Sequence, residues 1–406
     1  MTVQRLLLPL VSVIIIWAAL AAGSPTAPEA RWWRGNTHTH PLWSAGDAAP
    51  EVPTAWYKAN GYHFLVLSDH NILQVGERWF PVSEDGSARL KAAELEALQT
   101  RFAGQVEVRD GEKGREMRLH TLPELKARFD EGGQFLLVPG EEVTAHWKGA
   151  DQNHPVHINA IGLRGRIPPR GGDSVVDLMN SALEAIEAHG VEHGVPVLAH
   201  LNHPNFGWGV TWEDLAQMRA ERFFEVYNGH RGVRSHGDDA HLDTEAMWDM
   251  ANARRLSELD LPLLYGVATD DSHSYYGGRT SVTGRGWVQV WAPDLSEAAL
   301  IIAMKAGDFY ASSGVTLAAV SRTQERYRVE IDEEDGVGYT TQFVGVRAGQ
   351  DSATVLASTA ENPAVYEYGG DELFVRAVVT STQLHPDPYR EGDLQQAWTQ
   401  PLDVSR

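Results

Sequence analysis

The feature that most limits the fold of this chain is the alternation of short apolar runs with amphipathic stretches between Trp32 and about Gly314. The runs have the length of buried strands, and the stretches between them carry apolar residues at helical spacing. Such alternation is typical of α/β folds, and here it favours a barrel of parallel strands over an open doubly wound sheet. The predicted strands cover residues 63–67, 134–138, 156–161, 195–199, 223–227, 263–268 and 287–290.

Glycines mark the expected ends of several predicted helices. Gly61 closes residues 51–60, Gly132 and Gly133 close 122–131, and Gly190 closes 174–188. Glycine readily adopts the left-handed conformation that commonly ends a helix. Further helices are predicted at residues 211–221, 243–256 and 295–306, and residues 75–120 form a charged insertion long enough to be a flap.

Residues of the types that can bind metals, His, Asp and Glu, follow nearly every predicted strand. In a parallel α/β barrel the carboxyl ends of the strands meet at one mouth, where active sites are built. Each cluster alone is weak evidence, because a capping turn or a hydrogen-bonded surface histidine would look the same. Their accumulation predicts one site, built from His38-Thr39-His40, Ser68-Asp69-His70-Asn71, Glu141-Glu142, His154 to His157, His200 to His203 and Asp270-Asp271-Ser272-His273.

The first of these clusters is expected to begin the first strand. Alternate residues of a strand face the same way, so the imidazoles of His38 and His40 could point at one ion. Glu141 and Glu142 are adjacent carboxylates, which repel one another unless a cation or hydrogen-bond donors compensate.

The absence of cysteine restricts the chemistry of the site. A metal must be held by His, Asp and Glu, ligands that suit Zn, Mn or Fe, and a shared carboxylate suits two neighbouring metals. A metal pair lowers the pKa of a bridging water and polarises a substrate oxygen. We therefore predict a hydrolase of ester, carbamate or phosphoester bonds. Asp271 and His200 are the predicted catalytic residues, with His200 orienting a ligand or a substrate.

The formal net charge of −21 argues against nucleic acid as a partner. A polyanion would be repelled unless a basic cluster or bound metal reversed the field, and the sequence has no basic run of that kind. We expect a small-molecule substrate, and nothing in the sequence indicates an oligomeric state.

The N-terminus has the pattern of a signal peptide, predicted at residues 1–23. Arg5 precedes an apolar run at 6–20, and the small residues Ala21-Ala22-Gly23-Ser24 follow. The run is shorter than the ~20 residues that span a bilayer comfortably, which favours cleavage over the alternative, an uncleaved membrane anchor. Export to a periplasmic or extracellular location is expected, with no stable membrane insertion after cleavage.

The sequence changes character after Gly314. Short, partly alternating runs at 315–320, 327–331, 341–346 and 374–379 are separated by Gly, Asp, Glu and Pro. This pattern predicts a small antiparallel β domain over residues 315–406, which is structural or forms one wall of a substrate cleft.

Taken in order, the clusters resemble the motifs of the PHP (polymerase and histidinol phosphatase) superfamily of metal-dependent hydrolases. The matching segments are Gly35-Asn36-Thr37-His38-Thr39-His40, Leu67-Ser68-Asp69-His70-Asn71, Pro139-Gly140-Glu141-Glu142, His157-Ile158-Asn159, His203-Pro204 and Asp271-Ser272-His273. The resemblance spans residues 31–314 and implies a distorted (β/α)7 TIM-like barrel with two, and up to three, divalent metals.

The resemblance also implies a distribution of ligands. The first metal would be held by His38, His40, Glu142 and Asp271, the second by Glu142, His157 and His203, and the third by His70 and His273. Residues 43–51, 55–71 and 397–401 look like an exported branch related to the carbaryl and carbamate hydrolases. Relatives often carry Ser-Asp-Gly where this chain has Ser44-Ala45-Gly46, and Ala45 cannot bind a metal. Either Asp47 substitutes for the missing aspartate, or the third site is weak or empty.

Export and the lack of a phosphate-binding basic cluster favour a small ester, amide or carbamate substrate. The alternative is a phosphoesterase, because phosphate hydrolysis is the commonest activity of the superfamily. A third hypothesis is a non-catalytic binding protein of the cell envelope. Its only support is the absence of the expected carboxylate at Ala45. His230, His236 and His241 are expected to be ordinary surface residues of a polar loop.

Overall fold

The computed structural model describes residues 29–112, 114–278, 280–350 and 352–405. The predicted signal peptide lies outside these residues. None of the helices in the described ranges is both long and apolar enough to cross a membrane.

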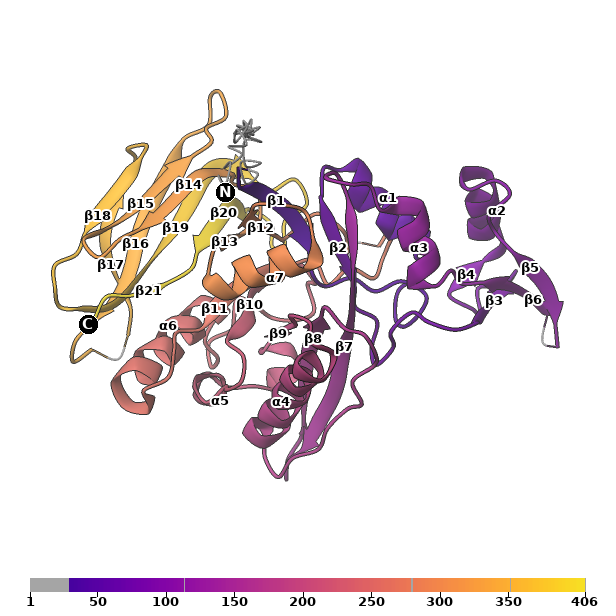
Figure 1. Ribbon diagram of the computed structural model, residues 1–406, viewed down its shortest axis with the longest axis horizontal. Helices are drawn as coiled ribbons and strands as arrows, with labels where there is room; N and C mark the ends of the chain where they lie inside the picture. Colours follow the sequence, from indigo (N-terminus) through magenta and orange to yellow (C-terminus); the bar gives the residue numbers. More distant parts are fainter. Residues whose placement is uncertain (1–28, 113, 279, 351, 406) are drawn as a thin grey trace, which may run out of the picture.

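The N-terminal part of the chain is a mixed sheet with helices packed against it (Figure 1). In order across the sheet, the strands are β11 (Tyr265–Thr269), β10 (Phe223–Asn228), β9 (Leu198–Leu201), β8 (Asn153–Ile161), β7 (Leu136–Lys148), β2 (Phe64–Leu67), β1 (Arg31–Asn36) and β12 (Trp287–Ala292). Parallel pairs join β1 to β2, β2 to β7, β9 to β10 and β10 to β11, whereas β7–β8, β8–β9 and β1–β12 are antiparallel.

This arrangement is an α/β fold, but it does not confirm the predicted closed barrel of parallel strands. Strand β7 runs on to Lys148 and returns at once as β8, and so short a connection can join only antiparallel strands. In the described part of the chain no ladder of hydrogen bonds joins β11 to β12, although the two strands pack near each other.

The helices lie where the sequence predicted them, with different ends. They are α1 (Glu51–Ala59), α3 (Leu122–Phe129), α4 (Val175–His193), α5 (Trp212–Ala216), α6 (Thr244–Arg254) and α7 (Glu297–Ala306), and the π-helical turn η2 (Arg255–Leu259) extends α6. The predicted end of α4 at Gly190 is wrong, because the helix continues to a left-handed Gly194. Gly190 is needed for close packing instead: a Cβ atom there would lie 2.7 Å from Val197 Cγ2.

The insertion after β2 is a small separate sheet that projects from the side of the molecule opposite the C-terminal strands (Figure 1). It contains one helix, α2 (Ala92–Arg101), beside β3 (Trp79–Ser83), β4 (Leu90–Lys91), β5 (Val108–Gly111) and β6 (Gly114–Arg118).

The C-terminal part is antiparallel, as predicted from its short alternating runs. Through β13 and β20 it continues the large sheet beyond β12, so no gap in pairing separates the two parts, and the boundary at Gly314 stays a prediction. Its strands are β13 (Phe309–Ser312), β14 (Leu317–Arg322), β15 (Arg326–Ile331), β16 (Tyr339–Arg347), β17 (Thr354–Thr359), β18 (Ala364–Glu367), β19 (Glu372–Leu384), β20 (Leu394–Thr399) and β21 (Leu402–Asp403).

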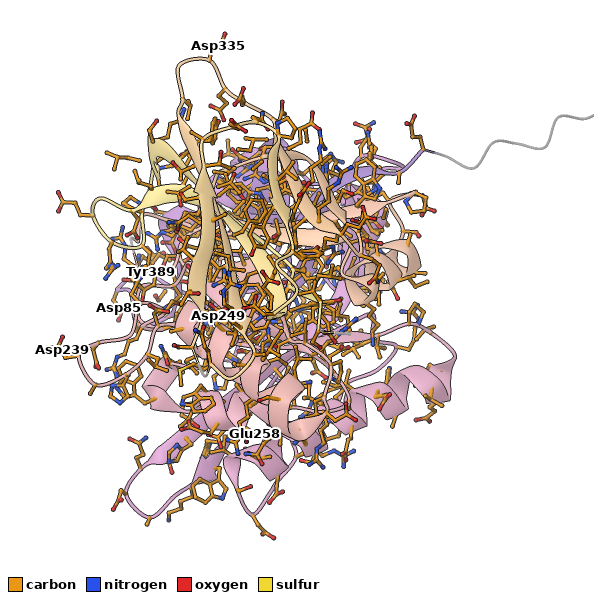
Figure 2. The ribbon with its side chains drawn as sticks, turned by 90° about the vertical axis from the view of Figure 1, so that its left-hand side faces the viewer. Asp85, Asp239, Asp249, Glu258, Asp335 and Tyr389 are labelled. Carbon is orange, nitrogen blue, oxygen red and sulfur yellow. The ribbon has the colours of Figure 1, made fainter. Side chains whose placement is uncertain are left out.

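A buried ion pair ties the C-terminal strands to helix α6. Arg376 on β19 donates from Nε and Nη2 to the two carboxylate oxygens of Asp249, both at 2.7 Å, and its Nη2 lies 3.2 Å from Glu245 Oε2. Figure 2 shows Asp249 on α6 where that helix meets the C-terminal sheet. The side chains of Arg376 and Asp249 are only 2% and 7% exposed, so each charge depends on the other.

Replacing this arginine is therefore expected to weaken the contact between the two parts. Arg376→Ala leaves the carboxylate of Asp249 buried without its cation, a loss of about 3–5 kcal/mol for a broken buried pair. We expect a clear fall in the thermal midpoint measured by circular dichroism. Arg390→Ala, which removes an exposed arginine that lies 3.8 Å from Asp393, is the matched control and should change the midpoint little. Equal shifts in the two variants would contradict the role given to Arg376.

Candidate metal centre

The first histidine pair lies just beyond strand β1, not within it. The strand ends at Asn36, whose side chain donates to the Gly286 carbonyl at 2.9 Å and accepts from the His38 amide at 2.9 Å. These bonds turn the chain out of the sheet, which is why the prediction that the pair begins a strand is wrong. His38 and His40 nevertheless come together, with ring centroids 5.0 Å apart and both side chains fully buried.

Glu142 on β7 is the carboxylate around which the histidines gather. Its oxygens lie 3.0 Å from His157 Nδ1, 3.5 Å from His38 Nε2 and 3.6 Å from His203 Nε2. His70 is in direct contact with it, and His40 Nε2 lies 3.7 Å away. Burial alone would raise the pKa of Glu142, but the facing histidines outweigh burial and hold that pKa well below its ordinary value.

Asp271 supplies the second carboxylate of the cluster. Its Oδ1 lies 3.3 Å from Nε2 of His38 and 3.3 Å from Nε2 of His40. Asp271 has a φ of 48° and His203 a φ of 24°, a region that non-glycine residues rarely adopt. Such conformations cost about 1–3 kcal/mol and are concentrated at functional sites, where the surroundings hold them.

Every predicted metal ligand takes part in this cluster, in overlapping groups whose ligand atoms lie within 4.8 Å of one another. His40 and His38 are shared between groups, as are His70 and Glu142. The groups are His38, His40 and Asp271; His38, Glu142 and His203; His70, Glu142 and His157; and His40, His70 and His273. The assignment of these residues as ligands stays a prediction, but the geometry that it requires is present.

The hydrogen bonds of the cluster fit a bound cation. Nε2 of His38 and Nε2 of His40 are buried and have no hydrogen-bond partner, although a buried polar atom is normally satisfied. Each of these atoms faces a carboxylate oxygen across a gap of 3.3 Å, too long for a good hydrogen bond and of the size left between two ligands of one ion. Imidazole and carboxylate donors without thiolate suit Zn, Mn or Fe.

A buried carboxylate behind the cluster orients His38. Glu225 Oε1 contacts His38 Nδ1 at 2.6 Å and accepts from the Thr269 hydroxyl at 2.7 Å, while its Oε2 accepts from the His203 amide and Asn228 Nδ2, both at 2.8 Å. Burial would raise the pKa of Glu225, but His38, and after it His203 and His200, lower that pKa to about 2. Glu225 therefore keeps a proton on His38 Nδ1 and leaves the Nε2 lone pair for a metal.

Two asparagines that sequence reasoning missed fix the position of Glu142. Asn202 Nδ2 donates to Glu142 Oε1 at 2.8 Å and to Asn159 Oδ1 at 2.9 Å. Asn159 in turn donates to the Thr37 carbonyl at 2.7 Å. The only sequence signal for either residue is its position within a histidine motif.

Glu141 and Glu142 do not share the site. They are adjacent residues of β7, and adjacent side chains of a strand point to opposite faces. Glu142 therefore faces the cluster, whereas Glu141 faces the other side of the strand and accepts from the Ile167 amide. Burial raises the pKa of Glu141 to about 7.

His200, predicted as a catalytic residue, lies beneath the cluster. It is fully buried, its Nε2 is 3.1 Å from the Thr37 hydroxyl, and its ring centroid is 6.3 Å from that of His38. Burial lowers its pKa to about 4. This placement favours the part of the prediction in which His200 orients another residue.

Ala45 is exposed, and the nearby carboxylate does not replace the missing aspartate. Asp47 accepts from the Tyr275 amide at 2.9 Å and belongs to none of the ligand groups found among the described residues. The group expected to hold the third metal therefore consists of three histidines, and the ring of His40 stacks on that of His70 and on that of His273, with centroids 4.5 and 4.2 Å apart.

The expectation that His230 is an ordinary surface residue is wrong. Its ring lies edge-on to that of His273, with centroids 5.6 Å apart, and its Nδ1 accepts from the Gly232 amide at 3.0 Å. That bond leaves the proton of the neutral ring on Nε2, so His230 offers a hydrogen-bond donor beside the cluster. Sequence reasoning did not place His230 at the site, because His230 lies outside the predicted motifs.

Comparison with known proteins gives only distant structural matches. No protein-family model matches the chain, and no curated protein matches it. One similar structure is a two-domain protein containing a predicted PHP-like metal-dependent phosphoesterase from Bacteroides vulgatus ATCC 8482, with 15% identity, 93% of this chain and 97% of that chain covered, and a TM-score of 0.42. Another has a provisional assignment as a metal-dependent phosphoesterase from Bifidobacterium adolescentis ATCC 15703, with 14% identity, 61% and 90% covered, and a TM-score of 0.29. Similarities this low do not transfer an activity to the chain.

The role of Glu225 can be measured through metal affinity. Glu225→Gln keeps the size of the side chain but loses the charge that holds the Nδ1 proton of His38. Its amide NH2 group would also face groups that donate hydrogen bonds to Glu225, such as the His203 amide and Asn228 Nδ2. Loss of such a supporting carboxylate typically weakens metal binding about 10–100-fold. Competition with a chromophoric chelator should show this loss, while Glu258→Gln on the exposed end of η2 should bind metal as the unaltered protein does. Unchanged affinity in Glu225→Gln would show that His38 does not need this partner.

Proposed function

We propose that this protein is a metal-dependent hydrolase that binds two, and up to three, divalent metals at the histidine–carboxylate cluster. The observation that carries the proposal is the convergence of all predicted ligands on Glu142 and Asp271, with buried Nε2 atoms of His38 and His40 that have no hydrogen-bond partner and are free to bind a cation. The PHP-type motifs in the sequence support the same conclusion, and membership of that superfamily is part of the proposal.

The residues of the chain have distinct parts in this function. Divalent metals at such a site supply Lewis acidity and activate water for attack on a carbonyl or phosphoryl group. Glu142 and Asp271 provide the negative charge that the site needs, Glu225 fixes the tautomer of His38, and Asn202 fixes the direction of Glu142. His230, whose Nδ1 accepts from the Gly232 amide, would offer its Nε2–H to an oxygen atom of a substrate.

The preferred substrate is a small ester, amide or carbamate. In the described residues, both cluster carboxylates form ion pairs with histidines and with no Arg or Lys, so none of these residues marks a phosphate subsite beside them. Arg279, which the sequence offers as a candidate for contact with a substrate, lies outside the described residues. A phosphoesterase is the second candidate, because bound metals alone can neutralise a phosphate. Export by the N-terminal signal and kinship with the carbaryl and carbamate hydrolases belong to this proposal as well.

Metal analysis combined with a substrate panel tests the proposal. Purified full-length protein loaded with Zn, Mn or Fe would be analysed for metal content and assayed with p-nitrophenyl acetate, a p-nitrophenyl carbamate and p-nitrophenyl phosphate. Two or more metals per chain with faster ester or carbamate hydrolysis is the expected result. Faster phosphate hydrolysis would favour the second candidate. Less than one metal per chain with no hydrolysis would favour a non-catalytic binding protein.

Substitution of one histidine of the cluster tests whether this site holds the metals and carries out the hydrolysis. His38→Ala removes a side chain shared by two ligand groups, so we expect at least one metal fewer per chain and a fall in hydrolysis of about 100-fold or more, typical when the group that stabilises transition-state charge is lost. His146→Ala, at an exposed position on β7, is the control and should keep both properties. Full metal content and full activity in His38→Ala would exclude the proposed centre.

A further inference from the structure

A buried carboxyl group is connected to one of the predicted ligands through a serine. Asp69 follows strand β2 and has no exposed surface, and its Oδ1 accepts a hydrogen bond from the Ser44 hydroxyl. The same hydroxyl lies 3.3 Å from Nδ1 of His40. A hydroxyl can accept one hydrogen bond while it donates another, so Ser44 can accept from His40 Nδ1 and donate to Asp69. We call these three residues the His40–Ser44–Asp69 relay.

The carboxyl group of Asp69 is fixed by a second donor. Gln74, which is fully buried, donates from Nε2 to Asp69 Oδ2 at 2.6 Å and to the Leu67 carbonyl at 3.0 Å. The backbone carbonyl of Asp69 accepts from the Glu142 amide at 3.1 Å. Both carboxyl oxygens thus have partners, and Asp69 belongs to none of the ligand groups found among the described residues. Its contact with the cluster is through Ser44.

The bond to Ser44 decides which nitrogen of His40 can bind a metal. When the proton of a neutral imidazole is on Nδ1, the free lone pair is on Nε2. In His40 that atom is buried, has no hydrogen-bond partner and lies 3.3 Å from Asp271 Oδ1. His38 has the same arrangement, with Glu225 at its Nδ1 and with its Nε2 also 3.3 Å from Asp271 Oδ1. The two histidines therefore direct equivalent nitrogens at one carboxylate oxygen.

His40 is shared between two of the candidate ligand groups, but it has one free lone pair to offer. The distance of 3.3 Å between its Nε2 and Asp271 Oδ1 favours the group that contains His38 and Asp271. The group of His40, His70 and His273 would then keep two imidazoles for an ion of its own. The relay thus bears on how the ligands are divided between the metals.

We propose that Asp69, acting through Ser44, is a positioning residue for His40. It holds the proton on Nδ1 of His40 and so commits Nε2 to the metal shared with His38 and Asp271. Groups that orient a ligand histidine in this way raise the affinity for the metal. This inference rests on the proposed function, because it takes the cluster as a metal centre, but it does not depend on which bond is hydrolysed.

Stepwise metal binding tests the relay without relying on turnover. The full-length protein, stripped of metal, would be titrated with Zn against a chromophoric chelator at about pH 8, because burial raises the pKa of Asp69 to about 7. Ser44→Ala and Asp69→Asn are each expected to weaken one bound Zn by about 10–100-fold, while any other Zn keeps its affinity. Ser44→Thr, which keeps the hydroxyl, should bind every Zn as the unaltered protein does.

The controls separate this inference from the proposed function. Ser181→Ala, which removes a hydroxyl bonded to the Gly171 carbonyl on α4, should bind Zn normally. Unchanged affinity in Ser44→Ala and Asp69→Asn would overturn the relay, as would an equal loss for every Zn or an equal loss in Ser44→Thr. Weakening of one Zn in Ser44→Ala and Asp69→Asn, in a protein that hydrolyses no ester, amide, carbamate or phosphoester, would support the relay and reject the proposed function. Less than one Zn per chain in the unaltered protein would overturn both.

Discussion

The burial of Glu142 among histidines is the constraint on which the rest of the structure depends. A carboxylate with no exposed surface is costly unless positive charge or hydrogen-bond donors surround it. Here His157, His70 and Asn202 meet that need at its oxygens. These groups come from the middle of β8, from just beyond β2 and from just beyond β9, so these three places must come together at Glu142 in the middle of β7. The requirement of one side chain thus fixes the relative position of several strands.

A second buried carboxylate extends this constraint away from the cluster. Glu225 on β10 joins His38, which follows β1, to Thr269 at the end of β11 and to the backbone of His203 after β9. The strained φ of His203 is explained by this bond, because the amide must point inward to reach the carboxylate. Ligand geometry and backbone geometry are therefore set by the same few hydrogen bonds.

Much of this arrangement could be predicted from the sequence. The helices α1, α3, α6 and α7 begin and end within a few residues of their predicted limits, because apolar spacing and capping residues act locally. The predicted ligands were found because imidazoles and carboxylates after apolar runs are uncommon without a function. The end of α4 was misjudged at Gly190, where glycine is required by the close packing of Val197 and not by a turn.

The sequence by itself determined which ligand types are available and in what order they follow the strands, since both depend on local spacing alone. Only the tertiary structure decided that β7 and β8 form a hairpin, that Glu141 faces away from Glu142, and that Glu225, Asn202 and His230 belong around the centre. It also decided that Ser44 connects Asp69 to His40. These features arise from contacts between segments far apart in the chain, and such contacts leave no periodic pattern in the sequence.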